Sequence, residues 1–156
     1  VHLPTACVAI SVAQMLTRFK ARFDTDRIQW QLCIDPLLTL NTDVTLLDII
    51  MNNLVDNALK YTYDEATVTV SFDQQTRQGV DGLLISVCNR PGAVGFPDPD
   101  RLFEKYYRAP RAHIRTGSGL GLYVARSFAA NMGGALSYHP STDLVCFNLW
   151  LPQQAP

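Results

Sequence analysis

Hydrophobic residues recur at two periods along the chain, and each period predicts its own kind of element. Apolar residues three or four positions apart indicate helices, whereas alternation of apolar and polar residues indicates half-buried strands. On this basis we expect helices over residues 5–23, 43–61 and 118–132. We expect strands over residues 28–34, 66–72, 83–88, 135–139 and 144–151.

Short segments between these elements predict how they are joined. Thr5 can cap the first helix, Gly133-Gly134 can end the last one, and the polar stretch 73–82 can form a hairpin connection. Strands in an antiparallel run, with helices gathered on one face, predict an α+β fold built as a two-layer α/β sandwich. At 156 residues the chain is long enough for one core, and we interpret residues 1–156 as a single domain.

Composition narrows the classes of function. The chain is 47% hydrophobic and 17% charged with a formal net charge of -1, which leaves no field that would attract nucleic acid or a membrane surface. No stretch approaches the roughly 18 continuous apolar residues of a membrane span. The cysteines show neither a C-x-x-C pair nor His neighbours at ligand spacing, so we expect reduced thiols, mostly in the core, at Cys7, Cys33, Cys88 and Cys146.

The helix predicted over residues 43–61 carries a polar stripe within "NNLVDNALKYT". At about 100° per residue, Asn53, Asn57 and Lys60 share one side of the helix, with Asp56 beside them. A solvated face is the ordinary explanation. A ligand is the alternative, because Asn is a mediocre helix former whose neutral oxygen suits a hard cation such as Mg²⁺. Lys60 would offer a positive charge to a phosphate.

A second candidate site lies in "RTGSGLGLYVAR", ahead of the last helix. Gly117, Gly119 and Gly121 would let backbone N–H groups approach a polyphosphate, and the helix N-terminus favours negative charge. A flexible hinge or close helix packing would explain the same glycines. The spacing matches neither the Rossmann nor the Walker A pattern. The long segment 89–121 before this helix is of a kind that is usually functional or mobile.

Three stretches, in order, resemble the motifs of sensor histidine kinases. "NNLVDNALKYT" resembles their N box, "RLFEKYYRAP" their F box, and "GSGLGLYVARSFAANMGG" their G2 box with its following helix. The resemblance runs over residues 23–152. It implies the Bergerat ATP-binding fold, with a mixed, mostly antiparallel sheet and helices on one face, and it implies ATP and Mg²⁺ as cofactors.

The resemblance also implies a role for each matching residue. Asn57 would be the Mg²⁺ ligand, and Asn53 and Lys60 would face the phosphates. Tyr61 would line the nucleotide site, while Arg108 would reach the phosphates from the F box. Residues 89–121 would hold the G1 region, the F box and the ATP lid. The lid hinge and phosphate-facing loop would consist of Gly117, Gly119, Leu120, Gly121 and Leu122.

The G1 box departs from the family pattern. Sensor histidine kinases usually carry D-x-G-x-G, in which the Asp accepts a hydrogen bond from the adenine amino group, whereas this chain reads "VCNRPGAVGF". Asn89 takes the Asp position. Pro91 and Ala93 take the glycine positions, and Gly92 between them is kept as a candidate nucleotide-binding residue. Because a neutral acceptor gives a weaker bond than a carboxylate, we expect ATP affinity to be lower by about tenfold.

The chain has no histidine in the setting of a phosphoacceptor, which is ordinarily followed by Glu or Asp on a dimerising hairpin. The resemblance implies that residues 1–23 hold the first helix and the exit from that hairpin. The domain would then donate the γ-phosphoryl group of ATP to a separate dimerisation domain of the same parent, and a response regulator would receive it. We expect a cytoplasmic domain, monomeric in isolation and without direct contact with nucleic acid or membrane, in a parent that could be an inner-membrane sensor.

Two other functions stay open at this point. A degenerate Bergerat domain would bind nucleotide weakly or not at all and act as a regulatory or interaction module, which the altered G1 box favours. An ATP-hydrolysing protein of the chaperone or topoisomerase kind fits less well. Those families generally place a Glu ahead of the N-box Asn as a base, and Asp48, Ile49 and Asn53 offer no equivalent.

Overall fold

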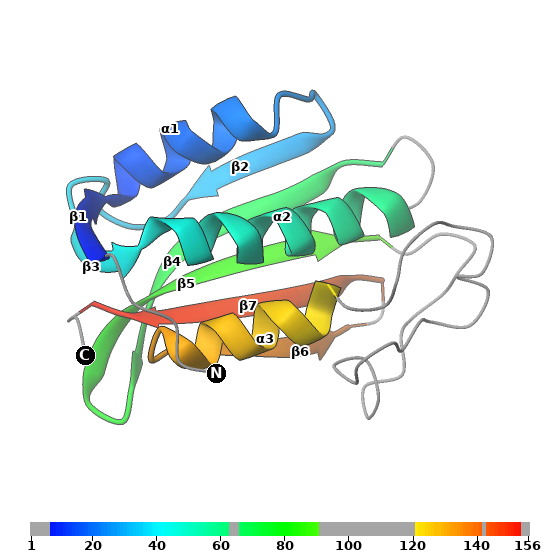
Figure 1. The fold of residues 1–156 in the computed structure, drawn as a ribbon. Coiled ribbons are helices and arrows are strands. Elements are labelled where there is room, and N and C mark those ends of the chain that lie inside the picture. The colour runs from blue at the N-terminus through cyan, green and yellow to red at the C-terminus, as the bar shows by residue number, and fades with distance from the viewer. Residues whose placement is uncertain (1–6, 63–65, 91–120, 142, 154–156) are drawn as a thin grey trace.

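The computed structural model describes residues 7–62, 66–90, 121–141 and 143–153. In this part of the chain the helices are α1 (Val12–Arg22), α2 (Val44–Tyr61) and α3 (Gly121–Asn131) (Figure 1). The strands are β1 (Cys7–Ser11), β2 (Ile28–Leu32), β3 (Thr39–Asp43), β4 (Val68–Arg77), β5 (Val80–Asn89), β6 (Ala135–Pro140) and β7 (Val145–Pro152). None of these helices is both long and apolar enough to cross a membrane.

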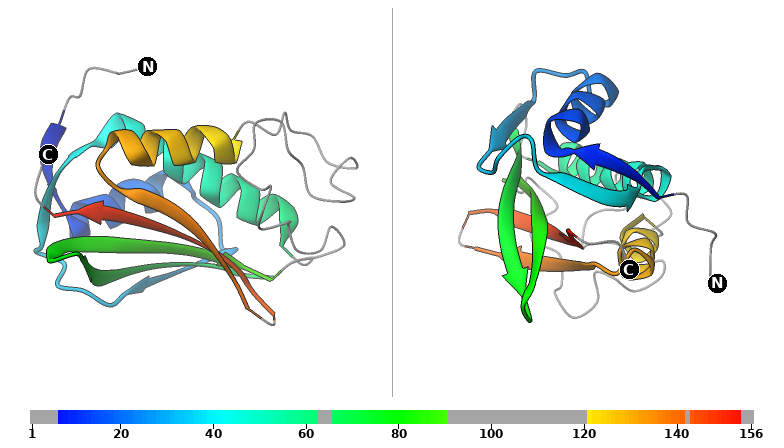
Figure 2. Two further views of the ribbon diagram at one scale, coloured as in Figure 1. Left: turned by 90° about the horizontal axis from the view of Figure 1, so that it is seen from below. Right: turned by 90° about the vertical axis from the view of Figure 1, so that its left-hand side faces the viewer.

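Five strands form the main sheet, in the order β2-β4-β5-β7-β6. β2 pairs with β4 in parallel, and the other neighbours pair antiparallel. The three helices lie on one face of this sheet (Figure 2). We call the opposite face, on which no described helix lies, the open face. The predicted α+β sandwich with a mixed, mostly antiparallel sheet is therefore confirmed. β1 and β3 form a separate antiparallel pair.

Alternation along the strands decides which side chains meet the helices. On β5, Ile85 and Val87 are fully buried beneath the helices, whereas Ser86 and Cys88 point to the open face and are half-buried. Successive side chains of a strand point to opposite faces, so one strand serves both the core and the open face. The end of β5 therefore places Asn89 on the helix side of the sheet, where it is 3% exposed.

β4 and β5 run further than their hydrophobic pattern predicted. They stay paired as far as Arg77 and Val80, so most of the stretch expected to be a connection is strand. The turn consists of Gln78 and Gly79, whose φ angles are 50° and 77°. Two-residue turns with positive φ match the twist of the flanking strands. The hairpin is confirmed, with a much shorter turn than expected.

The first helix is shorter than predicted, because the expected start at residue 5 is wrong. The helix begins at Val12, and Ser11 caps it: Ser11 Oγ accepts from the backbone N–H of Gln14 at 3.1 Å, and Gln14 Oε1 accepts from the backbone N–H of Ser11 at 2.9 Å. The segment before the cap is β1, which pairs with β3, a strand that the hydrophobic pattern did not predict. Pairing with β3, which is distant in the sequence, therefore makes this segment a strand although its apolar residues have helical spacing.

The predicted end of the last helix is confirmed. Gly133 has φ 76°, and its N–H donates to the carbonyl oxygen of Ala130 at 3.0 Å. The N–H of Gly134 donates to the carbonyl oxygen of Ala129 at 2.9 Å. These two bonds form a Schellman motif, which satisfies carbonyl groups left over at the end of α3.

Polar contacts tie α1 to α2. Arg18 Nε donates to both carboxylate oxygens of Asp48, at 2.9 and 3.1 Å, and Arg22 Nε donates to Asn52 Oδ1 at 2.8 Å. The hydrogen bond that Arg18 donates to Asp48, and then the negative charge of Asp48, raise the pKa of Arg18 above its ordinary value. These contacts hold one side of α2 against α1, and α3 packs on another side of α2.

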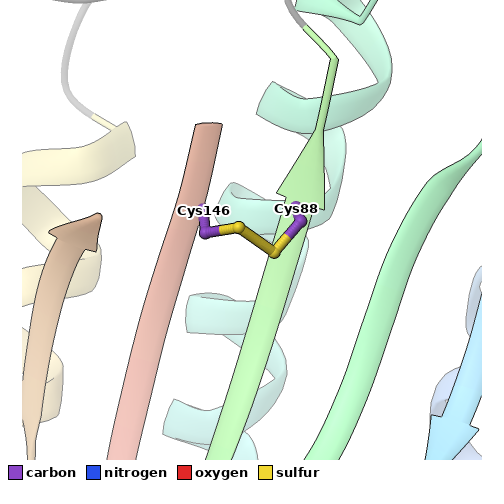
Figure 3. Close-up of a disulfide and its surroundings, with 2 residues drawn as sticks. All are labelled: Cys88 and Cys146. Carbon is purple, nitrogen blue, oxygen red and sulfur yellow. A yellow bond between two sulfur atoms is a disulfide. The ribbon is translucent and has the colours of Figure 1, made fainter. Parts of the chain in front are cut away.

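The expectation of four reduced, mostly buried thiols is wrong. Cys88 of β5 and Cys146 of β7 form a disulfide, whereas Cys7 and Cys33 are free and exposed (Figure 3). The pairing depends on strand register, which places Cys88 directly opposite Cys146 with a Cα–Cα distance of 4.1 Å. The spacing of the cysteines along the chain does not predict this pairing, because the two residues lie 58 positions apart and the strand register that opposes them is not a local property.

Candidate functional site

The polar stripe of Asn53, Asn57 and Lys60 lies on α2, as predicted. The helix begins after Asp43, whose carboxylate oxygen accepts from the N–H groups of the first turn at 3.1 Å. All three stripe residues are half-buried, while neighbours such as Leu54 are fully buried. The stripe is therefore only partly solvated. A helix with one half-buried polar edge needs a polar neighbour on that edge.

Lys60 is held by a weak partner. Its Nζ lies 3.2 Å from Asp56 Oδ2 one turn earlier, and the two side chains are 38% and 64% exposed. Exposed pairs at this helical spacing contribute only about 0.3 to 0.5 kcal/mol. Breaking the ion pair between Lys60 and Asp56 therefore costs little free energy, so Lys60 can bind an anion beside α2 instead.

The start of α3 lies against the stripe. A Cβ atom added at Gly121 would lie 3.2 Å from Oδ1 of Asn53, so the backbone of α3 passes close to that amide. Ala125 and Ala129 are fully buried and small, which allows α3 to approach α2 closely along its length (Figure 1). The N-terminus of a helix carries partial positive charge and N–H groups without helical partners. Two motifs far apart in sequence thus meet at one place.

The end of β5 is joined to the end of α2. Asn89, the last residue of β5, pairs with Val145 of β7 and is 3% exposed. Thr62 follows directly after α2 and is also 3% exposed, and its Oγ1 donates to the carbonyl oxygen of Arg90 at 3.2 Å. This contact connects the candidate adenine acceptor with the polar stripe. Sequence reasoning missed Thr62; its one signal is a hydroxyl placed just after the helix.

The remaining candidates divide into described and undescribed residues. Tyr61 is half-buried at the end of α2, and Leu122 is partly buried and packs against the hydrophobic core. The other candidates lie outside the described residues, and their roles stay predictions: Gly92, Arg108, Gly117, Gly119 and Leu120.

The donor groups of the stripe fit a metal–phosphate pair. Within the described residues, no three His, Cys, Asp or Glu side chains come together in a way that could hold a metal ion. Mg²⁺ does not require such a cluster, because it commonly binds one or two protein oxygens and completes its shell with water and phosphate. Asn57 offers one neutral oxygen, and Lys60 lies one turn away with a positive charge. This arrangement suits an anionic ligand whose own oxygen atoms also bind the metal ion.

A family comparison agrees with this geometry. The sequence model of the family described as "Histidine kinase-, DNA gyrase B-, and HSP90-like ATPase" matches residues 42–155, which include α2, β5 and α3. The chain belongs to this ATPase family. The resemblance to the ATP-binding domain of sensor histidine kinases, drawn from the three motifs, is thereby confirmed.

Relatives of this ATPase-family domain include sensor kinases of several bacteria. The chain is 26% identical over 153 residues to the sensor protein VanSC of Enterococcus gallinarum, covering 97% of this chain and 41% of that protein. It is 33% identical over 111 residues to the adaptive-response sensory kinase SasA of Gloeothece citriformis, covering 70% of this chain and 28% of that protein. The chain thus spans less than half the length of these relatives.

Solved structures share the fold of this ATPase-family domain. The catalytic domain of histidine kinase ThkA, free of nucleotide, has a TM-score of 0.75 at 19% identity, covering 96% of this chain and 97% of that one. Full-length ShkA in complex with AMPPNP has a TM-score of 0.72 at 24% identity, covering 100% of this chain and 33% of that one. The observed architecture is therefore that of a histidine kinase ATP-binding domain.

Proposed function

We propose that the chain is the catalytic ATP-binding domain of a two-component sensor histidine kinase. It binds ATP with Mg²⁺ and donates the γ-phosphoryl group to a histidine on a separate domain. The close approach of Asn53 to Gly121 is the main support for this proposal, because it brings the polar stripe of α2 next to the start of α3. Family membership supports the nucleotide, and the sensor-kinase relatives support the histidine acceptor.

The described side chains have chemistry suited to these roles. Asn57 would hold the Mg²⁺ ion through its side-chain carbonyl oxygen, and the bound ion would neutralise charge on the phosphates. Lys60 leaves Asp56 and binds a phosphate oxygen. The amide N–H of Asn53 and the first N–H groups of α3 donate to the phosphates. The acceptor imidazole is itself the nucleophile, so the reaction needs positioning and charge neutralisation rather than a general base.

Residues outside the described part complete the proposed phosphate site. Arg108 supplies a second positive charge to the phosphates. Gly117, Gly119 and Leu120 precede α3 in the sequence, and in this proposal their backbone N–H groups bind the polyphosphate. Gly92 belongs to the nucleotide-binding region after β5. The motif resemblance supports these assignments.

The base end of the nucleotide belongs to Asn89 and Tyr61. Asn89 accepts a hydrogen bond from the adenine amino group through its side-chain carbonyl oxygen, and Tyr61 lines the same end of the site. The bond between Thr62 and Arg90 supports this role, because it holds the end of β5 close to α2. A neutral acceptor makes this contact weaker than a carboxylate would.

The parent protein supplies what this chain lacks. We propose that a dimerisation domain elsewhere in the parent carries the acceptor histidine, and that a response regulator receives the phosphoryl group from it. The domain works in the cytoplasm, where ATP is supplied, and is a monomer when isolated. The short share of each relative that the chain covers supports a larger parent.

A degenerate module is the second candidate, and one observation favours it. Asn89 stands where the family carries Asp, so the adenine contact has lost its charge. In that case the domain binds nucleotide weakly or not at all and regulates or contacts other parts of its parent.

Calorimetric titration with a non-hydrolysable ATP analogue, with and without Mg²⁺, separates the two candidates. Asn57→Ala should weaken Mg²⁺-dependent binding at least tenfold, and Asn89→Asp should tighten binding roughly tenfold. Asn52→Ala is the matched control, since this neighbouring amide bonds Arg22 rather than lying on the stripe. Absence of binding to the native chain at millimolar nucleotide, by calorimetry and by a second method, would leave only the regulatory module.

A further inference from the structure

The disulfide occupies a particular place in the sheet. Cys88 and Cys146 are directly opposed across β5 and β7, and both point to the open face (Figure 3). Both are half-buried, and the described helices all lie on the other side of the sheet (Figure 2). A thiol reagent approaching the open face therefore meets no described helix. Accessible disulfides are the ones that exchange readily.

The neighbours of the pair on the open face are polar. His139 of β6 is the cross-strand partner of Cys146, and its Nε2 lies 3.0 Å from Ser137 Oγ on the same face. Facing side chains of neighbouring strands lie within contact range. The pair is therefore half-buried among polar side chains on the open face rather than sealed in the core.

The disulfide also lies beside the candidate nucleotide site. Asn89 follows Cys88 in the chain and points to the opposite face, toward the helices. The pair Asn89–Val145 is the last rung of the β5–β7 ladder, and Cys88–Cys146 is the rung before it. The covalent bond therefore prevents the end of the ladder from opening, and Asn89 stays in place. Without it, the last rungs are held by backbone hydrogen bonds, by the packing of Asn89 and by the bond from Thr62 to Arg90, and strand ends fray more readily than strand centres.

We propose that Cys88 and Cys146 form a thiol–disulfide exchange site whose redox state sets how firmly Asn89 is held. The effect on nucleotide affinity rests on the proposed function. Disulfides of proteins that work in a reducing compartment are usually transient and redox-sensing. The oxidised form clamps the strand end and binds nucleotide more tightly, and the reduced form releases the end and binds more weakly.

The exchange is a balanced two-electron reaction with a dithiol donor. A thiolate of the donor attacks one sulfur of the Cys88–Cys146 bond, the S–S bond breaks, and the sulfur that leaves takes a proton. The second thiol of the donor then attacks the mixed disulfide. Two thiols remain on the domain and one disulfide on the donor. Two electrons and two protons have passed to the domain.

The test uses the full chain carrying Cys7→Ser and Cys33→Ser, so that the only thiols are those of the pair. The protein is equilibrated with dithiothreitol, as the dithiol, at graded ratios of its reduced and oxidised forms, and free thiols are counted by alkylation and mass spectrometry. Affinity for the ATP analogue and hydrogen exchange at the amides of Asn89 and Arg90 are measured for both forms. The same chain with Cys88→Ser and Cys146→Ser is the control.

We expect reversible exchange in the folded protein, with stronger amide protection in the oxidised form. Reduction should weaken nucleotide binding roughly fivefold, which corresponds to the ordering of about one backbone residue. The serine control should behave as the reduced form under all conditions. A change in protection without nucleotide binding in either form would refute the proposed function and keep the exchange site. A pair that exchanges only after unfolding, or two forms with equal protection and affinity, would overturn the inference.

Discussion

Replacement of Thr62 by Val tests the link between α2 and β5. Valine keeps the shape of a side chain that is 3% exposed and removes the hydroxyl that donates to the carbonyl oxygen of Arg90 at 3.2 Å. A hydrogen bond of this kind contributes about 0.5 to 1.5 kcal/mol net. Because Arg90 is exposed, water can replace the lost donor, and we expect a loss of about 0.5 to 1 kcal/mol. The melting temperature should fall by about 1 to 4 °C.

Thr62→Ser is the matched control, since it keeps the hydroxyl and loses only a methyl group. Loss of the buried methyl costs about 0.8 kcal/mol, so stability alone does not separate the two variants. Hydrogen exchange at the amides of Asn89 and Arg90 does separate them. The Val variant should lose protection there and bind the ATP analogue more weakly, whereas the Ser variant should match the native chain. If the Val variant kept native protection and affinity, the Thr62 contact would have no part in holding the site.

Three further substitutions test the fold. Gly134→Ala should lower the free energy of unfolding by about 3 kcal/mol or prevent folding, because its Cβ would overlap the backbone oxygen of Trp150. Gly79→Ala should lower it by about 1 kcal/mol, because the space around Gly79 is open and only its φ of 77° is unfavourable for alanine. Equal losses of unfolding free energy for these two glycine variants, measured by urea denaturation, would contradict this account. Asp48→Asn should cost about 1 kcal/mol through Arg18, which is 43% exposed, and less in high salt, where charges are screened. A loss that does not depend on salt would assign the effect to packing alone.

The sequence by itself determined the elements whose signals are local. α2 was predicted almost to its ends, because an unbroken helical period follows Asp43, a good cap, and its polar stripe follows from the same period. The end of α3 ahead of Gly133 was predictable for a similar reason, since glycine tolerates the φ angle that a Schellman motif requires. Three motifs in the order that the family has them were enough to indicate the family, because they contain the residues whose chemistry suits the ligand.

Only the tertiary structure decided the features that depend on strand pairing and on helix contacts. β1 exists because β3 pairs with it, although its residues continue a helical period. The bond between Cys88 and Cys146 depends on the register of β5 and β7, which spacing along the chain does not record. The contacts that assemble the site, Asn53 with Gly121 and Thr62 with Arg90, join residues from separate elements. Such contacts are decided by how the layers pack, because hydrophobic patterning sets which face is buried but not which partner it meets.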